Sequence, residues 1–136
     1  MPGKSYQGDL PALQKEEITL ENLLKQSVHK IAVEIGSRNA GQYDKLNSTK
    51  AFLETVLSQA GYQVTRQEYQ INNKIYYNLA VEKVGTVHPN EVIIIGAHYD
   101  SAFTSPGAND NETAALGALL ESTTEAEVHQ LPRLLS

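Results

Sequence analysis

Apolar residues recur at helical spacing in two stretches near the start of the chain. The first stretch runs from Thr19, a residue type that caps helices, to Gly36, a residue type that ends them. Its apolar positions fall on one helical face: Leu20, Leu23, Leu24, Val28, Ile31, Ala32 and Ile35. The second stretch stops at Gly61 and carries Leu46, Phe52, Leu53, Val56, Leu57 and Ala60. The pattern predicts two consecutive amphipathic helices.

Strand-like segments follow the second helix. We predict strands at about 62 to 71 and 74 to 83, joined at Asn72 and Asn73, because Asn tolerates the positive φ of a hairpin turn. A further strand is predicted at 91 to 97, where Val92, Ile93, Ile94 and Ile95 form a β-branched run. The absence of polar alternation in this run is typical of a strand that is buried on both faces of a parallel sheet. The hairpin tyrosines are expected to pack on the sheet rather than to bind a substrate: Tyr69, Tyr76 and Tyr77.

The order of these elements predicts an α/β fold. The buried strand is followed by an Ala/Leu-rich stretch, residues 114–120, which indicates a crossover helix. We expect a three-layer α/β/α sandwich with a mixed, mostly parallel sheet. Residues 1–17 are polar, contain two prolines and are predicted to form a flexible arm, and residues 18–136 are predicted to form one α/β unit.

Composition narrows the classes of protein and of site. With 136 residues, 40% hydrophobic and 20% charged, the chain has the composition of a soluble globular protein. The net charge of −5 and the absence of a basic run argue against a nucleic-acid partner. The chain has no cysteine, so only His and carboxylate side chains can bind zinc. No signal-peptide core or membrane span is present, so we expect a cytoplasmic location by default and no membrane partner.

Three polar residues follow the predicted buried strand at short spacing. His98 and Asp100 stand at its carboxyl end, where parallel sheets place functional groups. A carboxylate close to a zinc-binding imidazole commonly fixes the orientation of the ring. Ten residues further on, past a Pro-Gly loop, Asp110 precedes the predicted helix. The order of these residues is typical of the beginning of a metal site in a hydrolase.

Each of these residues has an ordinary structural alternative. A histidine after a strand can be a hydrogen-bonded structural residue, and an aspartate before a helix can be its N-cap. Cap chemistry alone does not require the whole series of strand, His98, Asp100, loop and Asp110, so the series favours a site. His29 and His88 have no such context: we expect His29 to pack or to face water and His88, in a turn before Pro89, to be exposed.

The motifs in this order resemble the first half of the di-zinc aminopeptidases. They are AHYDS at 97–101, SPGANDN at 105–111 and an Ala/Leu-rich helix ending in LLE, and upstream EIGSRNAG, AFLETVLSQAGYQVTRQEY and NLAVEK extend the likeness. This family includes the bacterial leucyl aminopeptidases and has glutaminyl cyclases and transferrin-receptor ectodomains as relatives. The resemblance implies that His98 binds one zinc ion, that Asp110 bridges two, and that Asp100 is the acid that positions His98. It also implies that residues 18–136 are the N-terminal half of a peptidase-like domain, and its relatives are often exported.

The resemblance also implies ligands that this chain does not contain. The family site needs a Glu-Glu pair, a later Asp and a distal His, all downstream of the bridging aspartate. No Asp follows Asp110, and the adjacent pair Glu16-Glu17 precedes the first ligand. The tail residues Glu125, Glu127 and His129 are expected to be solvated rather than metal ligands. We therefore expect the fold to stop after its first half and the site to remain incomplete within this chain.

The sequence leaves the function open between three interpretations. The first is a truncated, inactive piece of a zinc-dependent aminopeptidase, which would take peptide substrates with a free N-terminus once completed. The second is a non-catalytic binding or structural homologue of the same fold. The third is half of an enzyme that a second chain completes, with docking or self-association through an exposed sheet edge. A single-zinc glutaminyl cyclase shares the first-half residues and is also compatible with them.

Overall fold

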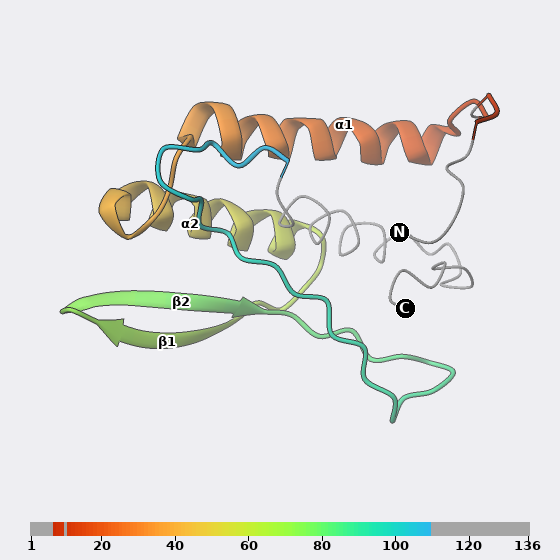
Figure 1. Ribbon diagram of the computed structural model, residues 1–136. Coiled ribbons are helices and arrows are strands. Elements are labelled where there is room, and N and C mark those ends of the chain that lie inside the picture. The colour runs from red at the N-terminus through yellow and green to blue at the C-terminus, as the bar shows by residue number, and fades with distance from the viewer. Residues whose placement is uncertain (1–6, 10, 110–136) are drawn as a thin grey trace.

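The computed structural model describes residues 7–9 and 11–109, and its elements form two helices and a hairpin (Figure 1). Helix α1 is Lys15–His29 and continues as a π-helix, η1, Lys30–Ile35. A short 3₁₀ turn, η2, Ala40–Gln42, leads into helix α2, Tyr43–Gln59. Strands β1, Thr65–Ile71, and β2, Lys74–Ala80, pair in antiparallel fashion. The two helices lie on one side of the hairpin, with α2 nearer to it.

Helix α1 begins at Lys15, within the stretch predicted as an arm and before the predicted cap. The backbone N–H of Gln14 donates to the carboxylate of Glu17 at 2.6 Å, which satisfies one of the free donors at the helix start. Thr19 lies inside the helix, and its hydroxyl donates to the carbonyl oxygen of Lys15 at 3.0 Å. The prediction of a cap at Thr19 is therefore wrong, because acidic residues one turn earlier stabilise an earlier start.

Both predicted helix ends are confirmed. Gly36 follows η1 with φ +76°, and Gly61 follows α2 with φ +89°. A side chain at either position would be strained, since residues with a Cβ rarely adopt positive φ. In the part of the chain that the structure describes, no helix combines the length and the apolar composition needed to cross a membrane.

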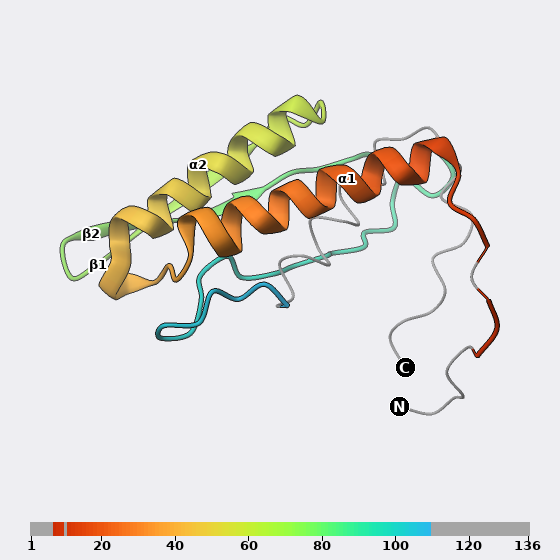
Figure 2. The ribbon, with the colours of Figure 1, turned by 90° about the horizontal axis from the view of Figure 1, so that it is seen from above.

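The core lies between the two helices, which run antiparallel and side by side (Figure 2). Val56 of α2 is buried and packs against Leu20 and Leu24 of α1 and against its own neighbours Phe52, Leu53 and Ala60. Burial of one such aliphatic side chain contributes about 1.5–3 kcal/mol to folding. The other buried apolar side chains belong to η1 and α2: Ile31, Ala32, Ile35, Leu46 and Leu57. The two predicted amphipathic faces therefore meet each other.

The predicted hairpin is confirmed, with strands shorter than expected. Asn72 and Asn73 both have positive φ, 49° and 62°, as a two-residue type I′ turn requires. The rings of Tyr69 and Tyr76 stack across the strands at 5.9 Å between centroids. The Tyr43 hydroxyl of α2 donates to the Ile75 carbonyl oxygen at 2.6 Å, which ties the hairpin to the helix.

The prediction of a buried strand at 91–97 is wrong for the described structure. This segment forms no strand, and residues Val92, Ile93 and Ile94 are 82%, 83% and 87% exposed. A buried strand needs hydrogen-bonding partners at its edges and covering layers on its faces. Within residues 7–9 and 11–109 the assigned sheet is the two-stranded antiparallel hairpin, so the fold is α/β in general. The three-layer sandwich and the mostly parallel sheet remain predictions.

Candidate functional site

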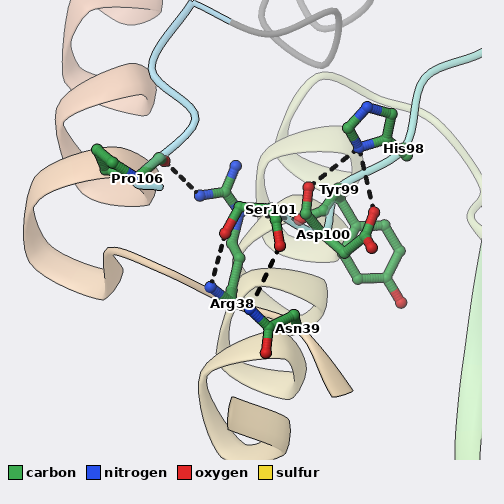
Figure 3. Close-up of polar contacts among 7 residues, drawn as sticks. All are labelled: Arg38, Asn39, His98, Tyr99, Asp100, Ser101 and Pro106. Atoms are coloured by element: carbon green, nitrogen blue, oxygen red, sulfur yellow. Dashed lines mark hydrogen bonds and ion pairs between the residues drawn. The ribbon is translucent and has the colours of Figure 1, made fainter. Parts of the chain in front are cut away.

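His98 and Asp100 are in direct contact, as Figure 3 shows. The Nδ1 atom of His98 lies 3.1 Å from the Asp100 carboxylate and 3.0 Å from the Asp100 backbone carbonyl oxygen. Both acceptors favour the tautomer in which Nδ1 carries the proton, so that Nε2 carries the lone pair that a metal ion can accept. The two side chains are 49% and 59% exposed, so solvent reaches the pair. This arrangement is the one that a zinc-binding histidine and its orienting carboxylate require.

Asp110, the third residue of the predicted site, lies outside the described residues. The described chain leads toward it through Pro106, Gly107, Ala108 and Asn109. Within residues 7–9 and 11–109 no three His, Asp or Glu side chains gather closely enough to hold a metal ion. The described residues therefore fit one zinc ligand with its orienting acid, and do not make a complete site.

The segment that carries His98 and Asp100 is held by the loop between η1 and η2. Arg38 is fully buried, and its Nε atom donates to the Tyr99 carbonyl oxygen at 2.8 Å. The backbone N–H of Arg38 donates to Ser101 Oγ at 3.0 Å, and the Ser101 N–H donates to the Arg38 carbonyl oxygen at 2.7 Å. The Asn39 side-chain amide donates to the carbonyl oxygens of Ser101 and Phe103, at 3.3 and 2.7 Å. Two parts of the sequence more than 60 residues apart are thereby joined.

No periodic pattern in the sequence points to Arg38 as part of this arrangement. An arginine in a polar loop between two helices usually faces water. The one signal is the motif EIGSRNAG, which contributes to the family resemblance without assigning a role to its arginine. A buried arginine is detected only when the chain that covers it is in place.

Tyr99, which lies between His98 and Asp100 in the chain, is half-buried. Its hydroxyl donates to the Tyr77 carbonyl oxygen of β2 at 2.7 Å. Burial, with smaller effects of the neighbouring Tyr69 and Glu54, raises the pKa of Tyr99 to about 12. A phenol with this pKa stays protonated near neutral pH, so Tyr99 serves as a structural donor and not as a base.

Comparisons with known proteins show which family this segment resembles. The family model described as Peptidase family M28 matches residues 78–133, which include His98, Asp100 and Asp110. This stretch resembles the M28 peptidases. The resemblance drawn from the motifs is therefore confirmed, and it places the chain near metallopeptidases, a class of hydrolases.

One curated protein that matches most of this chain carries no functional description. The protein described as Uncharacterized protein YfbL of Escherichia coli (strain K12) is 32% identical over 104 residues. The match covers 71% of this chain and 32% of that protein, so the chain spans about a third of the length of this relative. No solved structure is a significant match to the chain.

The two other described histidines lie on the surface and pair with glutamates. His88, inside the M28-like stretch, lies 3.8 Å from Glu91, and His29, outside it, lies 3.5 Å from Glu34. A hydrogen bond and the charge of Lys30, with a smaller effect of His29, hold the pKa of Glu34 below its ordinary value. These pairs are exposed, and solvent screens them. They offer a useful contrast to His98, whose acceptors belong to an anchored segment.

Proposed function

We propose that this chain is the N-terminal part of a zinc-dependent aminopeptidase, a metallo-exopeptidase that hydrolyses N-terminal peptide bonds. The observation that carries the proposal is the His98–Asp100 pair, which lies inside the M28-like stretch and has the contact expected of a zinc ligand and its orienting acid. M28 peptidases are generally zinc-dependent.

Three residues have distinct roles in this proposal. His98 and Asp110 would hold the metal, and Asp100 would hold the imidazole of His98 in the metal-binding tautomer. When bound, zinc supplies a water of lowered pKa and polarises the substrate carbonyl group. The substrate is a peptide with a free amino terminus. The Asp100 carboxylate accepts a hydrogen bond from Nδ1–H of His98, so that Nε2 stays unprotonated and available to the metal.

The chain by itself is proposed to be inactive. It has no aspartate after Asp110 and no adjacent glutamate pair downstream of it, so the general base and the further ligands have no counterpart. Loss of a positioned general base alone typically costs about 10²–10⁴ in rate. A single imidazole with one carboxylate holds zinc weakly, since zinc sites are usually four-coordinate.

A second candidate, a half-enzyme completed by another polypeptide, is favoured by one observation. Residues 92–95 precede the His98–Asp100 pair directly, and Val92, Ile93 and Ile94 are largely exposed. An extended apolar segment with solvent-exposed edges is suited to pair with a strand of a second chain. In that case the missing ligands come from the second chain, and the chemistry is unchanged.

The test is a chimera in which this chain replaces the matching stretch of the E. coli relative. The chimera and the unaltered relative are assayed with a leucyl anilide, which has a free amine, and with its N-acetylated form. We expect the chimera to cleave only the free-amine substrate, to lose activity with a chelator and to regain it with zinc. His98→Ala should lower the rate at least about 100-fold, and the matched control His88→Ala should leave it unchanged.

Several results would contradict this proposal. Cleavage that is insensitive to the chelator would exclude a metal-dependent reaction. Equal cleavage of the acetylated substrate would exclude an aminopeptidase. A chimera that binds zinc but does not hydrolyse, beside an active relative, would favour the non-catalytic homologue. Activity that appears only when this chain is mixed with a separately expressed remainder of the relative would support the half-enzyme.

A further inference from the structure

We propose that Arg38 is the positioning residue of the His98–Asp100 pair: it fixes the two peptide groups on either side of Asp100 and thereby the acceptors that the imidazole meets. The consequence for metal binding rests on the proposed function. The geometric part stands on the contacts of Arg38 alone.

The first contact fixes the peptide group before Asp100. The Nε atom of Arg38 donates to the Tyr99 carbonyl oxygen at 2.8 Å, and that carbonyl belongs to the planar unit joining Tyr99 to Asp100. The same guanidinium donates through one terminal nitrogen to the carbonyl oxygens of Pro106, at 2.7 Å, and Gly36, at 3.2 Å. The rigid fork of an arginine holds these acceptors at fixed relative positions.

The second contact fixes the peptide group after Asp100. The Ser101 N–H donates to the Arg38 carbonyl oxygen at 2.7 Å, and this N–H shares a planar unit with the Asp100 carbonyl. In a trans peptide the N–H and the carbonyl point in opposite directions, and no described peptide bond is cis. With the N–H directed at Arg38, the Asp100 carbonyl oxygen is directed away from it, and His98 Nδ1 lies 3.0 Å from that oxygen. One residue therefore controls both sides of Asp100.

The surroundings of Arg38 leave little room for a different arrangement. The side chain is fully buried, and a buried guanidinium is tolerated only when its donors are satisfied. A Cβ atom added to Gly107 would lie 3.3 Å from a terminal nitrogen of Arg38 and 3.5 Å from Ser101 Cβ. The backbone N–H of Arg38 donates to Ser101 Oγ at 3.0 Å, which adds a further bond to the same segment (Figure 3). The loop and the arginine are packed as one unit.

An arginine that merely joined two loops would stabilise the fold without selecting a state of His98. An arginine that positions the pair has a further effect. It keeps both acceptors, the carboxylate and the carbonyl oxygen of Asp100, close to Nδ1 of His98, and this selects the tautomer that is protonated at Nδ1. The tautomer of His98 is therefore the property that separates the two roles. It can be measured in the absence of any metal or substrate.

The test is nitrogen-15 NMR of the histidine rings in this chain and in its Arg38→Lys variant. Lysine keeps the charge but has a single ammonium group, which cannot reproduce the fork. We expect His98 in the parent chain to show predominantly the Nδ1–H form, and the variant to show a mixture of both tautomers while the amide signals of α2 and the hairpin stay in place. Arg66→Lys is the matched control, because the exposed Arg66 forms its ion pair with the half-buried Glu54 and not with the His98–Asp100 pair, and it should leave His98 unchanged. A folded Arg38→Lys chain with the parent tautomer would overturn the proposal.

A second measurement on the unaltered chain covers the case in which Arg38→Lys does not fold. The Ser101 amide should exchange with solvent at least about tenfold more slowly than the amide of Ile94 in the exposed segment, after correction for intrinsic rates. Equal exchange rates would show that Arg38 does not hold the peptide group, and would also overturn the proposal.

The zinc affinity of the chimera carrying Arg38→Lys gives the functional consequence. We expect it to fall by about 10–100-fold, as for other groups that orient metal ligands. Zinc binding and turnover absent from every chimera, with the NMR and exchange results as expected, would refute the proposed function and leave the positioning role intact. Unchanged affinity in a zinc-binding chimera would show that the positioning has no effect on the metal.

Discussion

Two neighbouring segments of this chain differ in exposure and in the number of hydrogen bonds that hold them. The apolar segment, residues 92–95, contains the longest β-branched run of the sequence, yet three of its side chains are more than four-fifths exposed. The anchored loop, residues 99–107, is mostly polar, yet buried Ser101 and its contacts with Arg38 tie it to the helical part. The difference shows that apolar composition alone does not bury a segment. Directional hydrogen bonds to a buried arginine fix the polar segment. The apolar segment has no sheet partner among the described residues and stays exposed.

The largest expected effect is the loss of the arginine itself. Arg38→Ala removes a fully buried side chain and leaves the partly buried carbonyl oxygens of Tyr99 and Pro106 without this donor, so it should lower the free energy of unfolding by about 2–4 kcal/mol. Urea denaturation followed by circular dichroism measures the change. The control Arg66→Ala removes the exposed arginine of the ion pair with the half-buried Glu54 and should cost about 1 kcal/mol. Equal costs for both variants would mean that the anchored loop contributes no more than the surface.

A smaller effect is expected at the glycine that packs on the guanidinium. Gly107 has φ +65°, so Gly107→Ala combines backbone strain with a close contact to Arg38 and should cost about 1–2 kcal/mol. Gly96→Ala, where an added Cβ would have no atom within 4 Å and φ is not positive, should change stability by less than about 0.5 kcal/mol.

Gly61→Ala separates strain from packing in this comparison. Gly61 also has a positive φ, of +89°, but an added Cβ would have open space around it. If Gly107→Ala and Gly61→Ala cost the same in thermal or urea denaturation, the packing on Arg38 has no energetic role and the distinction between the two segments weakens.

The stability of the anchored loop should depend on pH through Tyr99. Burial raises the pKa of its phenol from 10.0 to about 12, so the folded state holds the proton more tightly than the unfolded state. The resulting stabilisation is fully present below pH 10 and is lost as the pH rises from about 10 to about 12. The difference in tyrosinate absorbance between the parent chain and Tyr99→Phe should titrate near 12. A midpoint near 10 for this difference would mean that the loop leaves Tyr99 open to solvent.

The smallest effect is expected in the apolar segment. Because Ile94 is 87% exposed, Ile94→Ala should change the free energy of unfolding by less than about 0.5 kcal/mol. Leu57→Ala in the buried face of α2 is the matched control and should cost about 2–5 kcal/mol. If Ile94→Ala costs as much as Leu57→Ala, Ile94 is buried in solution, as the sequence pattern predicts.

Local signals in the sequence predicted the elements that depend on local interactions. The helix ends at Gly36 and Gly61 and the turn at Asn72-Asn73 follow from the φ values that these residue types accept. The predicted start of α1 at Thr19 is wrong because two local signals compete. The Glu17 carboxylate stabilises an earlier start, and the threonine lies inside the helix. The spacing of His98 and Asp100 was sufficient to predict their contact, which needs only two residues of chain.

The sequence by itself therefore determined the two amphipathic helices, the hairpin and the His98–Asp100 pair, because each depends on residues close together in the chain. Only the tertiary structure decided the exposure of residues 92–95, since burial of a strand depends on partners that no local pattern contains. Only the tertiary structure revealed Arg38, whose partners at Tyr99, Ser101 and Pro106 lie more than 60 residues away. Hydrogen bonds over such a separation form after the chain has closed a long loop, and their energies are set by burial rather than by sequence spacing.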